Sequence, residues 1–573
     1  MINILKENFR SAILRFGLLG SIVALYLAAV GMIETFLPRL LVGTSITLGH
    51  VFLLSAAIGA GFFSARELKE HNIGVTATAG FISGAISSLF LVILTFVIQI
   101  FVVQTAGQNN IFNLREMFVN FSPTLLGFLT FGRGLVLGNI MLAALFGLMG
   151  VLGASFAFLP EKIRRGWFNG LVWVLGIGLF SENVAQILRE FSLTGLNKLI
   201  FTGKSLNPVA ALVIFALTFA AGYFGVKTAT NNKWQSFSPE RQKQGRLIFT
   251  ILGILFVATL PWMVGLFLSQ ALFIIGMYVM MGLGLNIVVG YAGLLDLGYV
   301  AFFAFGAYTM GILTSTGELG RSGLNFWGAL PFAVLAGVLW GLVLGFPVLR
   351  MRGDYLAIVT LGFGEIIRIL ALSNWIAPLG GGAQGVLHIP KPVLFGIVMD
   401  SPQAMYYIVV LGALLAAFVT VRLRDSRLGR QWMAMREDED VAEAMGINLV
   451  QTKLLAFAIG AAFSALAGAI FAARIGNIFP HSFNILISMN AISLIIVGGL
   501  GSIPGVIVGA IILIGLPEML REFAEYRLLM YGFLLIIMML AKPDGFWPEK
   551  RRRQELKAEQ ERQLASQTTG SEN

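Results

Sequence analysis

The sequence contains no cysteine and only four histidines among its 573 residues. Without cysteine the chain can form neither disulfides nor thiolate-bound metal sites, and cysteine content says nothing here about the cellular compartment. The histidines, at positions 50, 71, 388 and 481, lack the short spacing of metal-ligand motifs. We therefore expect no metal centre and no bound cofactor.

Charged residues are also scarce: Asp, Glu, Lys and Arg make up 12% of the chain, whereas 57% of it is hydrophobic. Soluble domains contain roughly 45–50% apolar residues and about 25% charged ones. The apolar residues form continuous runs, such as 247–268 and 404–421, rather than the alternating pattern of barrel strands. This composition predicts an all-α fold, a polytopic transmembrane helical bundle with about 14–16 membrane segments.

The net charge of +11 comes from basic residues that lie beside the apolar runs. That distribution is typical of cytoplasmic loops in membrane proteins, and we expect no nucleic acid partner. With the N-terminus inside, the loops 104–122 and 374–403 face outward and hold only Arg115 and Lys391. Both termini are therefore predicted to be cytoplasmic. The first apolar run, 16–37, could be a cleaved signal peptide, but its length favours an uncleaved first helix.

A polar, basic stretch at 227–246 divides the chain into two hydrophobic blocks. It predicts a cytoplasmic linker between an N-terminal block of about six membrane helices, 1–226, and a second domain, 247–547. The remainder, 548–573, is a charged tail that we expect in the cytoplasm. The apolar pair at 486–516 is short for two ordinary spans, so it predicts either a re-entrant hairpin or two broken helices.

Motifs of enzymes are not evident in this sequence. The nearest match to a phosphate-binding loop is Gly203-Lys204-Ser205, but the glycine required five residues before Gly203 is replaced by Lys198. We expect a transport subunit rather than an enzyme. If ATP drives this transport, another chain must hydrolyse it.

The segment 422–453 concentrates charge between two apolar runs, with six Lys/Arg and six Asp/Glu. Each charge at the bilayer centre costs at least about 2.5–3.5 kcal/mol, so this segment must be a loop at one membrane surface. Residues 430–446 show a helical pattern, with Trp432 and Met435 among charged side chains. The segment is either a plain solvated loop or, as we favour, a short cytoplasmic helix that docks onto a partner.

Few polar residues interrupt the apolar runs of the second domain. Glu365 and Arg368 could line a translocation path, but an ion pair that stabilises the bundle is the preferred interpretation. Asp296 could also line a path, although we favour an N-cap for a helix that begins at Leu297. Three more residues could contact a solute or join helices, with neither interpretation preferred: Ser488, Asn490 and Ser493.

Six blocks of the second domain occur in the order found in one family of transport proteins. They are LGLNIVVGYAGLLDLGYVAFFAFGAY (283–308), LRMRGDYLAIVTLGFGEIIR (349–368), GGGAQG (380–385), DSRLGRQWMAMREDEDVAEAMGINLVQTKLLAF (425–457), IIVGGLGSIPGVIVGA (495–510) and LLMYGFLLIIMMLAKPDGF (528–546). The region of about 283–546 thereby resembles branched-chain amino acid ABC-importer permeases, specifically their LivM-type subunit. The family has serine where this chain has Asp296. Residues 1–226 show no match to the family's blocks.

The resemblance implies a permease of an ATP-driven importer in the bacterial plasma (inner) membrane. Its partners would be a LivH-type permease, two cytoplasmic ATPase subunits, an extracytoplasmic solute-binding protein and membrane lipid. The segment 440–446 parallels the EAA-x-x-x-G pattern that couples such permeases to the ATPase. The coupling residues would be Arg430, Arg436, Glu437, Asp440, Ala442, Glu443 and Gly446.

Two alternatives remain open from the sequence. Importers of urea or short amides share the same blocks, so the solute could belong to that class. A secondary transporter driven by an ion gradient is less favoured, because it would need intramembrane carboxylates, for which Asp296 and Glu365 are the candidates.

Overall fold

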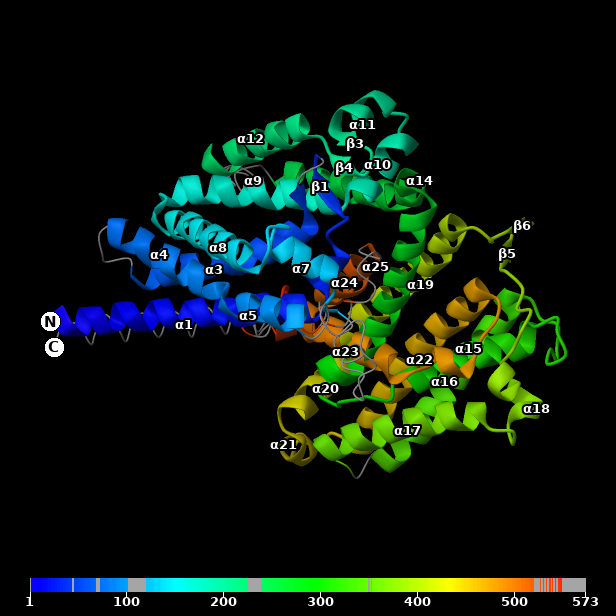
Figure 1. Ribbon diagram of the computed structural model, residues 1–573. Helices are drawn as coiled ribbons and strands as arrows, with labels where there is room; N and C mark the ends of the chain where they lie inside the picture. Colours follow the sequence, from blue (N-terminus) through cyan, green and yellow to red (C-terminus); the bar gives the residue numbers. More distant parts are fainter. Residues whose placement is uncertain are drawn as a thin grey trace. The chain divides into compact units, whose positions relative to one another are not determined.

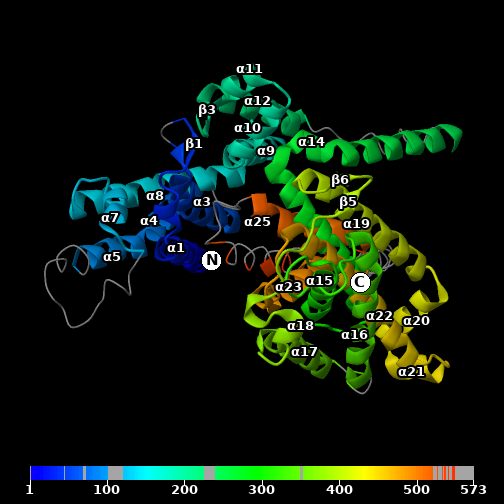
Figure 2. The same cartoon turned by 90° about the vertical axis from the view of Figure 1, so that its right-hand side faces the viewer.

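The computed structural model describes residues 2–43, 46–68, 73–100, 120–224, 239–348, 351, 353–519 and isolated positions between 526 and 548. The chain divides into two compact units, Met1–Leu247 and Ile248–Asn573. Both are built from helices with only a few two- or three-residue strands (Figures 1 and 2), which confirms the all-α fold.

The predicted linker and tail fall largely on positions that the structure does not describe. Residues 225–238 lie outside the described residues, whereas 239–246 form the first turns of a long helix. Of the tail 548–573, only Pro548 is described. The assignment of roles to the domains stays a prediction.

The first unit contains four long helices that pack together, α1 (Ile2–Ala29), α3 (Leu48–Glu67), α4 (Ile73–Ser87) and α8 (Leu135–Phe158). Its other elements are α2 (Met32–Thr35), β1 (Leu40–Val42), β2 (Ile46–Thr47), α5 (Leu89–Ile98), α7 (Pro123–Leu129), α9 (Glu161–Leu179), α10 (Ser181–Glu190), α11 (Thr194–Ile200), β3 (Phe201–Thr202), β4 (Ser205–Leu206) and α12 (Pro208–Phe224). The strands form one small sheet in the order β2-β1-β4-β3.

Glycine allows the helices of the first unit to approach closely. A Cβ atom on Gly61 of α3 would lie 2.0 Å from the carbonyl oxygen of Gly150 in α8, and one on Gly84 of α4 would lie 2.4 Å from that of Phe146. Apolar side chains gain little by leaving lipid for another helix, so close van der Waals packing of small residues stabilises such bundles. These glycines therefore set the helix spacing.

The second unit begins within α14 (Pro239–Leu285), which is followed by η2 (Asn286–Tyr291), and its central helix is α22 (Leu449–Ile475). Its other helices are α15 (Val300–Thr314), α16 (Phe326–Val348), α17 (Asp354–Leu372), α18 (Ala377–Gly380), η3 (Gly382–Gln384), α19 (Pro402–Arg424), α20 (Arg427–Glu437), α21 (Glu439–Ala444), η4 (Pro480–Ser482), α23 (Ile485–Gly498), α24 (Ile503–Ala510), η5 (Ile511–Gly515) and α25 (Leu516–Met519), and a hairpin joins β5 (Val393–Leu394) to β6 (Ile397–Val398).

Helix α22 is the core of this unit, because its surface of alanine and glycine lets α15 and α16 pack against its backbone. A Cβ on Gly306 of α15 would lie 2.1 Å from the Ala465 carbonyl oxygen, and one on Gly468 would lie 2.0 Å from that of Phe303. The apolar stretch of α22 is 72% buried, the highest value among the candidate spans.

Helix α14 bends where Pro261 and Gly265 interrupt it, and Gly265 has a φ of 76°. Proline has no amide hydrogen to donate to Val257 O, which would be left without a partner in hydrocarbon. The Tyr406 hydroxyl of α19 donates to that oxygen at 2.9 Å, and the Tyr407 hydroxyl donates to Ala258 O at 2.7 Å. Two tyrosines therefore stabilise the bend.

Among the described residues, ten helices are long and apolar enough to cross a membrane, or up to eleven if the bent pair α9–α10 counts as one span. Three shorter apolar helices are α12, α15 and the continuous stretch Ile503–Met519. Two segments predicted separately, 247–268 and 270–291, merge in the candidate span Ile251–Tyr291. The predicted segment 525–541 lies mostly outside the described residues.

The glycine packing of the first unit predicts opposite effects at two neighbouring positions of α3. Gly61→Ala should lower the midpoint of thermal unfolding in detergent, because overpacking against α8 costs about 1–3 kcal/mol. Gly59→Ala should leave the midpoint unchanged or raise it slightly, since no atom lies within 4 Å of a Cβ there. Equal midpoints for the two variants would contradict this account of the packing.

Candidate functional site

The helical path of the second unit breaks between η2 and α15, where Gly293 has a φ of 73°. Three amides at and just before the start of α15 are bound by side chains of the turn itself, α17 and α23. Gly298 N donates to Asp296 Oδ1 at 2.9 Å, Leu297 N donates to Thr360 Oγ1 of α17 at 3.0 Å, and Val300 N donates to Ser488 Oγ of α23 at 2.8 Å. The break is thus a hydrogen-bonded junction of α15, α17 and α23.

Asp296 does not N-cap a helix that begins at Leu297, as the sequence suggested, because α15 begins at Val300. Its side chain instead holds the turn that precedes α15. Asp296 is fully buried, and its Oδ2 has no hydrogen-bond partner among the described residues. A role for Asp296 and Ser488 in a translocation path stays a prediction.

Asn286 is a buried polar residue of this junction that sequence reasoning missed. Its Oδ1 accepts a hydrogen bond from Gly501 N at 2.9 Å and so joins η2 to the glycine-rich turn 498–502. Its position in a π-helix is characteristic of functional regions. The only signal in the sequence was an isolated asparagine inside an apolar run.

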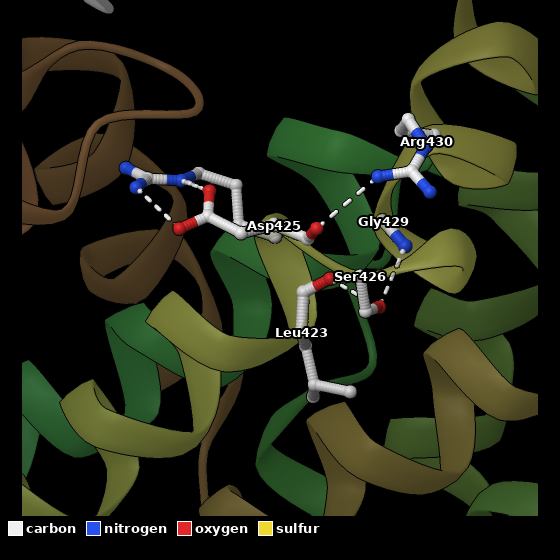
Figure 3. A network of polar contacts seen from close by, with 6 residues as sticks. Leu423, Asp425, Ser426, Gly429 and Arg430 are labelled. Atoms are coloured by element: carbon white, nitrogen blue, oxygen red, sulfur yellow. Dashed lines mark hydrogen bonds and ion pairs between the residues drawn. The ribbon is translucent and has the colours of Figure 1, made fainter.

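The loop 422–453 contains two helices rather than the single helix predicted for 430–446. Asp438 has an extended backbone between α20 and α21, and its Oδ1 accepts from the amides of Asp440 and Val441. This carboxylate caps a new helix, which explains why the first one ends. Figure 3 shows the corner before α20, where Ser426 caps that helix by accepting from Gly429 N.

Charged residues at the same corner are paired. Arg430 Nη1 donates to Asp425 O at 3.2 Å (Figure 3), and Arg424 Nε donates to Asp425 Oδ1 at 2.8 Å. The hydrogen bond from Arg424 holds the pKa of the Asp425 carboxyl below its usual value. The corner therefore stays charged and solvated, as the sequence predicted for a surface loop.

Helices α20 and α21 are anchored to α22 by buried contacts. Trp432 is fully buried and its Nε1 donates to Thr452 O at 2.8 Å. Lys453 is 2% exposed, and its Nζ donates to Glu439 Oε2 at 2.9 Å. Arg436 Nη1 donates to Gly290 O in η2. A movement of α20 would thus be transmitted directly to the junction before α15.

The predicted coupling residues divide into two groups. Ala442 is buried, and Arg430 and Arg436 bind backbone carbonyls of this chain. Arg430 and Arg436 are nevertheless exposed, as are the remaining residues, Glu437, Asp440, Glu443 and Gly446. Sequence reasoning did not select Val441 and Met445, which are 58% and 79% exposed on and just after α21. Exposed apolar residues within a charged segment were the available signal.

The remaining candidates lie on α17 and α23. Glu365 and Arg368 form the expected ion pair, with Arg368 Nε 2.8 Å from Glu365 Oε2, and both side chains are about one-third exposed. On α23, Asn490 Nδ2 lies 3.5 Å from the Tyr278 hydroxyl, and Ser493 is partly buried. The structure brings Asp296 and Ser488 to the junction but does not show Glu365, Asn490 or Ser493 bonded to it.

The buried ion pair that anchors α21 can be tested with a double-mutant cycle. Glu439→Gln should lower the free energy of unfolding by about 1.5–3 kcal/mol, because the Lys453 ammonium stays buried without its charged partner. Adding Lys453→Met should recover part of the loss. The measurement is the thermal unfolding of all three variants and the parent, and a Glu439→Gln variant as stable as the parent would exclude this role.

Substitution of Ser488, which accepts the hydrogen bond from the first amide of α15, can show whether this serine is structural or contacts solute. Ser488→Ala should destabilise the protein by about 1–3 kcal/mol, since Val300 N–H loses its buried acceptor. Ser493→Ala on the same helix is the matched control and should have little effect. Unchanged thermal stability of Ser488→Ala, combined with lost uptake, would instead support the path interpretation.

Comparisons with known proteins extend the resemblance seen in the sequence. Residues 267–541 match the family described as branched-chain amino acid transport system / permease component. The chain is 38% identical over 371 residues to the high-affinity branched-chain amino acid transport system permease protein LivM of Escherichia coli K12, covering 61% of this chain and 86% of that protein. LivM of Salmonella typhimurium is 43% identical over 306 residues, covering 49% of this chain and 70% of its own length.

A second type of permease is also similar. LivH of Escherichia coli K12 is 36% identical over 154 residues, which cover 26% of this chain and 49% of LivH. The match to Escherichia coli LivM covers a larger share of the chain than the second unit occupies, so it reaches into the first unit. No solved structure matches the chain. The chain therefore belongs to the family of branched-chain amino acid transport permeases, and it is a multi-pass membrane component of a transport system rather than its ATPase.

Proposed function

We propose that this permease imports branched-chain or related amino acids, and that ATP hydrolysis on separate subunits drives the import. The similarity to LivM and LivH, which are permeases of branched-chain amino acid transport systems, supports this class of solute over urea or short amides. The observation that carries the mechanism is the continuous contact from the exposed surface of α21, through α20, to the junction before α15.

The proposed coupling follows from these contacts. An ATPase subunit would bind the surface formed by Asp440, Val441, Glu443 and Met445. Its closure on ATP would move α20 and α21 as one body, because Trp432 and the Lys453–Glu439 pair hold them on α22. Arg436 would transmit that movement to η2, and hence to the side chains that position α15. Coupling by rigid-body movement of this kind is well known in switching proteins.

The assembly that we propose contains this chain, a LivH-type permease, two cytoplasmic ATPases, an extracytoplasmic solute-binding protein and surrounding lipid. The similarity to both LivM and LivH supports a pair of related permeases. We place the assembly in a bacterial plasma (inner) membrane.

The contacts near the end of the second unit support a cytoplasmic C-terminus. Phe546 N donates to Val497 O and Trp547 N donates to Gly498 O, beside the turn that Asn286 binds. Arg436 of α20 contacts η2 at this same end. If α20 and α21 face the ATPase, residues 546–547 lie on the cytoplasmic side. The orientation of the N-terminus rests on the basic residues alone.

An ion-coupled secondary transporter is a weaker proposal, because both candidate carboxylates already have local roles. Asp296 accepts a hydrogen bond within its own turn, and Glu365 pairs with Arg368. Neither arrangement by itself indicates an ion path.

The proposed ATPase-binding surface on α21 can be tested by substitutions that should not alter the stability of the fold. Met445→Asp and Glu443→Lys alter exposed side chains, so the thermal midpoint should stay at the parent value. Co-purification of the ATPase subunits and uptake of radiolabelled leucine should each fall at least about tenfold, equivalent to about 1.4 kcal/mol of docking energy.

Arg427→Glu, a charge reversal at the other end of the loop, is the matched control and should retain both activities. If Met445→Asp and Glu443→Lys retain the ATPase and normal uptake, α21 is not the docking element.

A further inference from the structure

A partly open cavity of about 290 Å³ lies in the second unit between α15 and α17, with Trp340 of α16 on one side. At its inner end, α17 meets the junction closely: a Cβ on Gly298 would lie 1.8 Å from Thr360 O, and one on Gly364 would lie 3.2 Å from the Gly298 Cα. Beyond this contact the cavity separates α17 from α15, and residues of α18 and η4 line its other end. Figure 1 shows α18 at the end of α17 that is remote from α21.

The lining of the cavity is almost entirely hydrocarbon. Aliphatic residues such as Ile312, Ile367 and Ala371 face it, and the stacked rings of Phe305 and Trp340, with centroids 4.2 Å apart, form part of its wall. Small-molecule pockets measure about 300–1,000 Å³, so this one is at the small end of the range. It suits a solute of amino acid size with an apolar side chain.

The lining contains one charged residue, Arg368, and two neutral polar ones, Tyr308 and Thr309. The Tyr308 hydroxyl is buried and has no hydrogen-bond partner among the described residues. Arg368 also lines the cavity, and its Nε and Nη2 both contact the same oxygen of Glu365. A guanidinium has five N–H donors, so this geometry leaves donors for a second carboxylate. The Glu365 carboxylate keeps the pair neutral overall, which matches a zwitterion of no net charge.

We propose that this cavity is a solute site of the permease, which takes the aliphatic side chain of an α-amino acid and binds its carboxylate through Arg368. The assignment rests on the proposed import of such amino acids. A lipid acyl chain would also suit the hydrocarbon lining, but it would offer no acceptor to the remaining donors of Arg368. The site lies beyond the junction, so movement of α15 against α17 would change its shape.

This chain contains no cysteine, so an introduced thiol can be followed by mass spectrometry of the chain after labelling of the assembled importer in proteoliposomes. Ala371→Cys places a single thiol in the cavity, and Glu318→Cys places one on the exposed surface after α15. Millimolar L-leucine should slow modification of the thiol at 371 by a small neutral methanethiosulfonate at least fivefold, while L-lysine should not. The thiol at 318 should react equally with and without leucine.

Leucine uptake by the parent importer distinguishes failure of the proposed function from failure of the proposed solute site. If the parent takes up no leucine, the proposed function fails. If it takes up leucine but leucine does not protect the thiol at 371, the solute site is refuted while the function stands. A thiol at 371 that never reacts during normal uptake would equally refute it, because it would show a cavity closed to water, as expected for bound lipid.

A size test provides a second measurement. Ala371→Phe should raise the KM for leucine at least tenfold more than the KM for alanine, because the added ring occupies the space for the larger side chain. Ile369→Phe, on a position of α17 that is 57% exposed and does not line the cavity, should leave the ratio unchanged. An equal change for both solutes in Ala371→Phe would contradict the proposal.

Discussion

One constraint determines the organisation of the second unit: each backbone amide that lacks a helical acceptor at a break in the bundle must donate a hydrogen bond to another group. Where η2 ends and α15 begins, Asp296 and Thr360 accept hydrogen bonds from amides of the turn before α15, and Ser488 accepts one from the first amide of α15. In hydrocarbon each unbound group would cost several kcal/mol, so these side chains cannot separate from the junction independently. Helices α15, α17 and α23 are thereby held to one point, and the cavity opens just beyond it.

A second consequence of this constraint is mechanical. The carbonyl of Gly290, also at the break, accepts from Arg436 of α20, so the charged surface loop reaches the junction through one side chain. The small residues of α22 keep α15 and α16 at backbone contact distance, which leaves little room for independent movement. Docking at α21 and reshaping of the cavity can therefore belong to a single rigid-body transition.

Much of this architecture could be predicted from sequence. Long apolar runs predicted the helices, and the charge of 422–453 placed that loop at a membrane surface. Glu365 and Arg368, three residues apart on one helix, form the expected pair because their separation is local. Two predictions failed for different reasons. Asp438 ends α20 by a local cap on α21, which competed with a continuous helix over 430–446. The start of α15, in contrast, depends on Ser488, 188 residues away in sequence.

The sequence by itself determined the class of this protein, because hydropathy, basic loops and ordered family blocks are properties of local composition and order. Only the tertiary structure decided which polar residues hold helices together and which face a cavity or solvent. Ser488 and Asp296 bind backbone amides, whereas Tyr308 and Arg368 line the cavity and Met445 lies exposed. The physical reason is that a side chain's role depends on the partners it meets across the bundle, and hydropathy along the chain does not encode those partners.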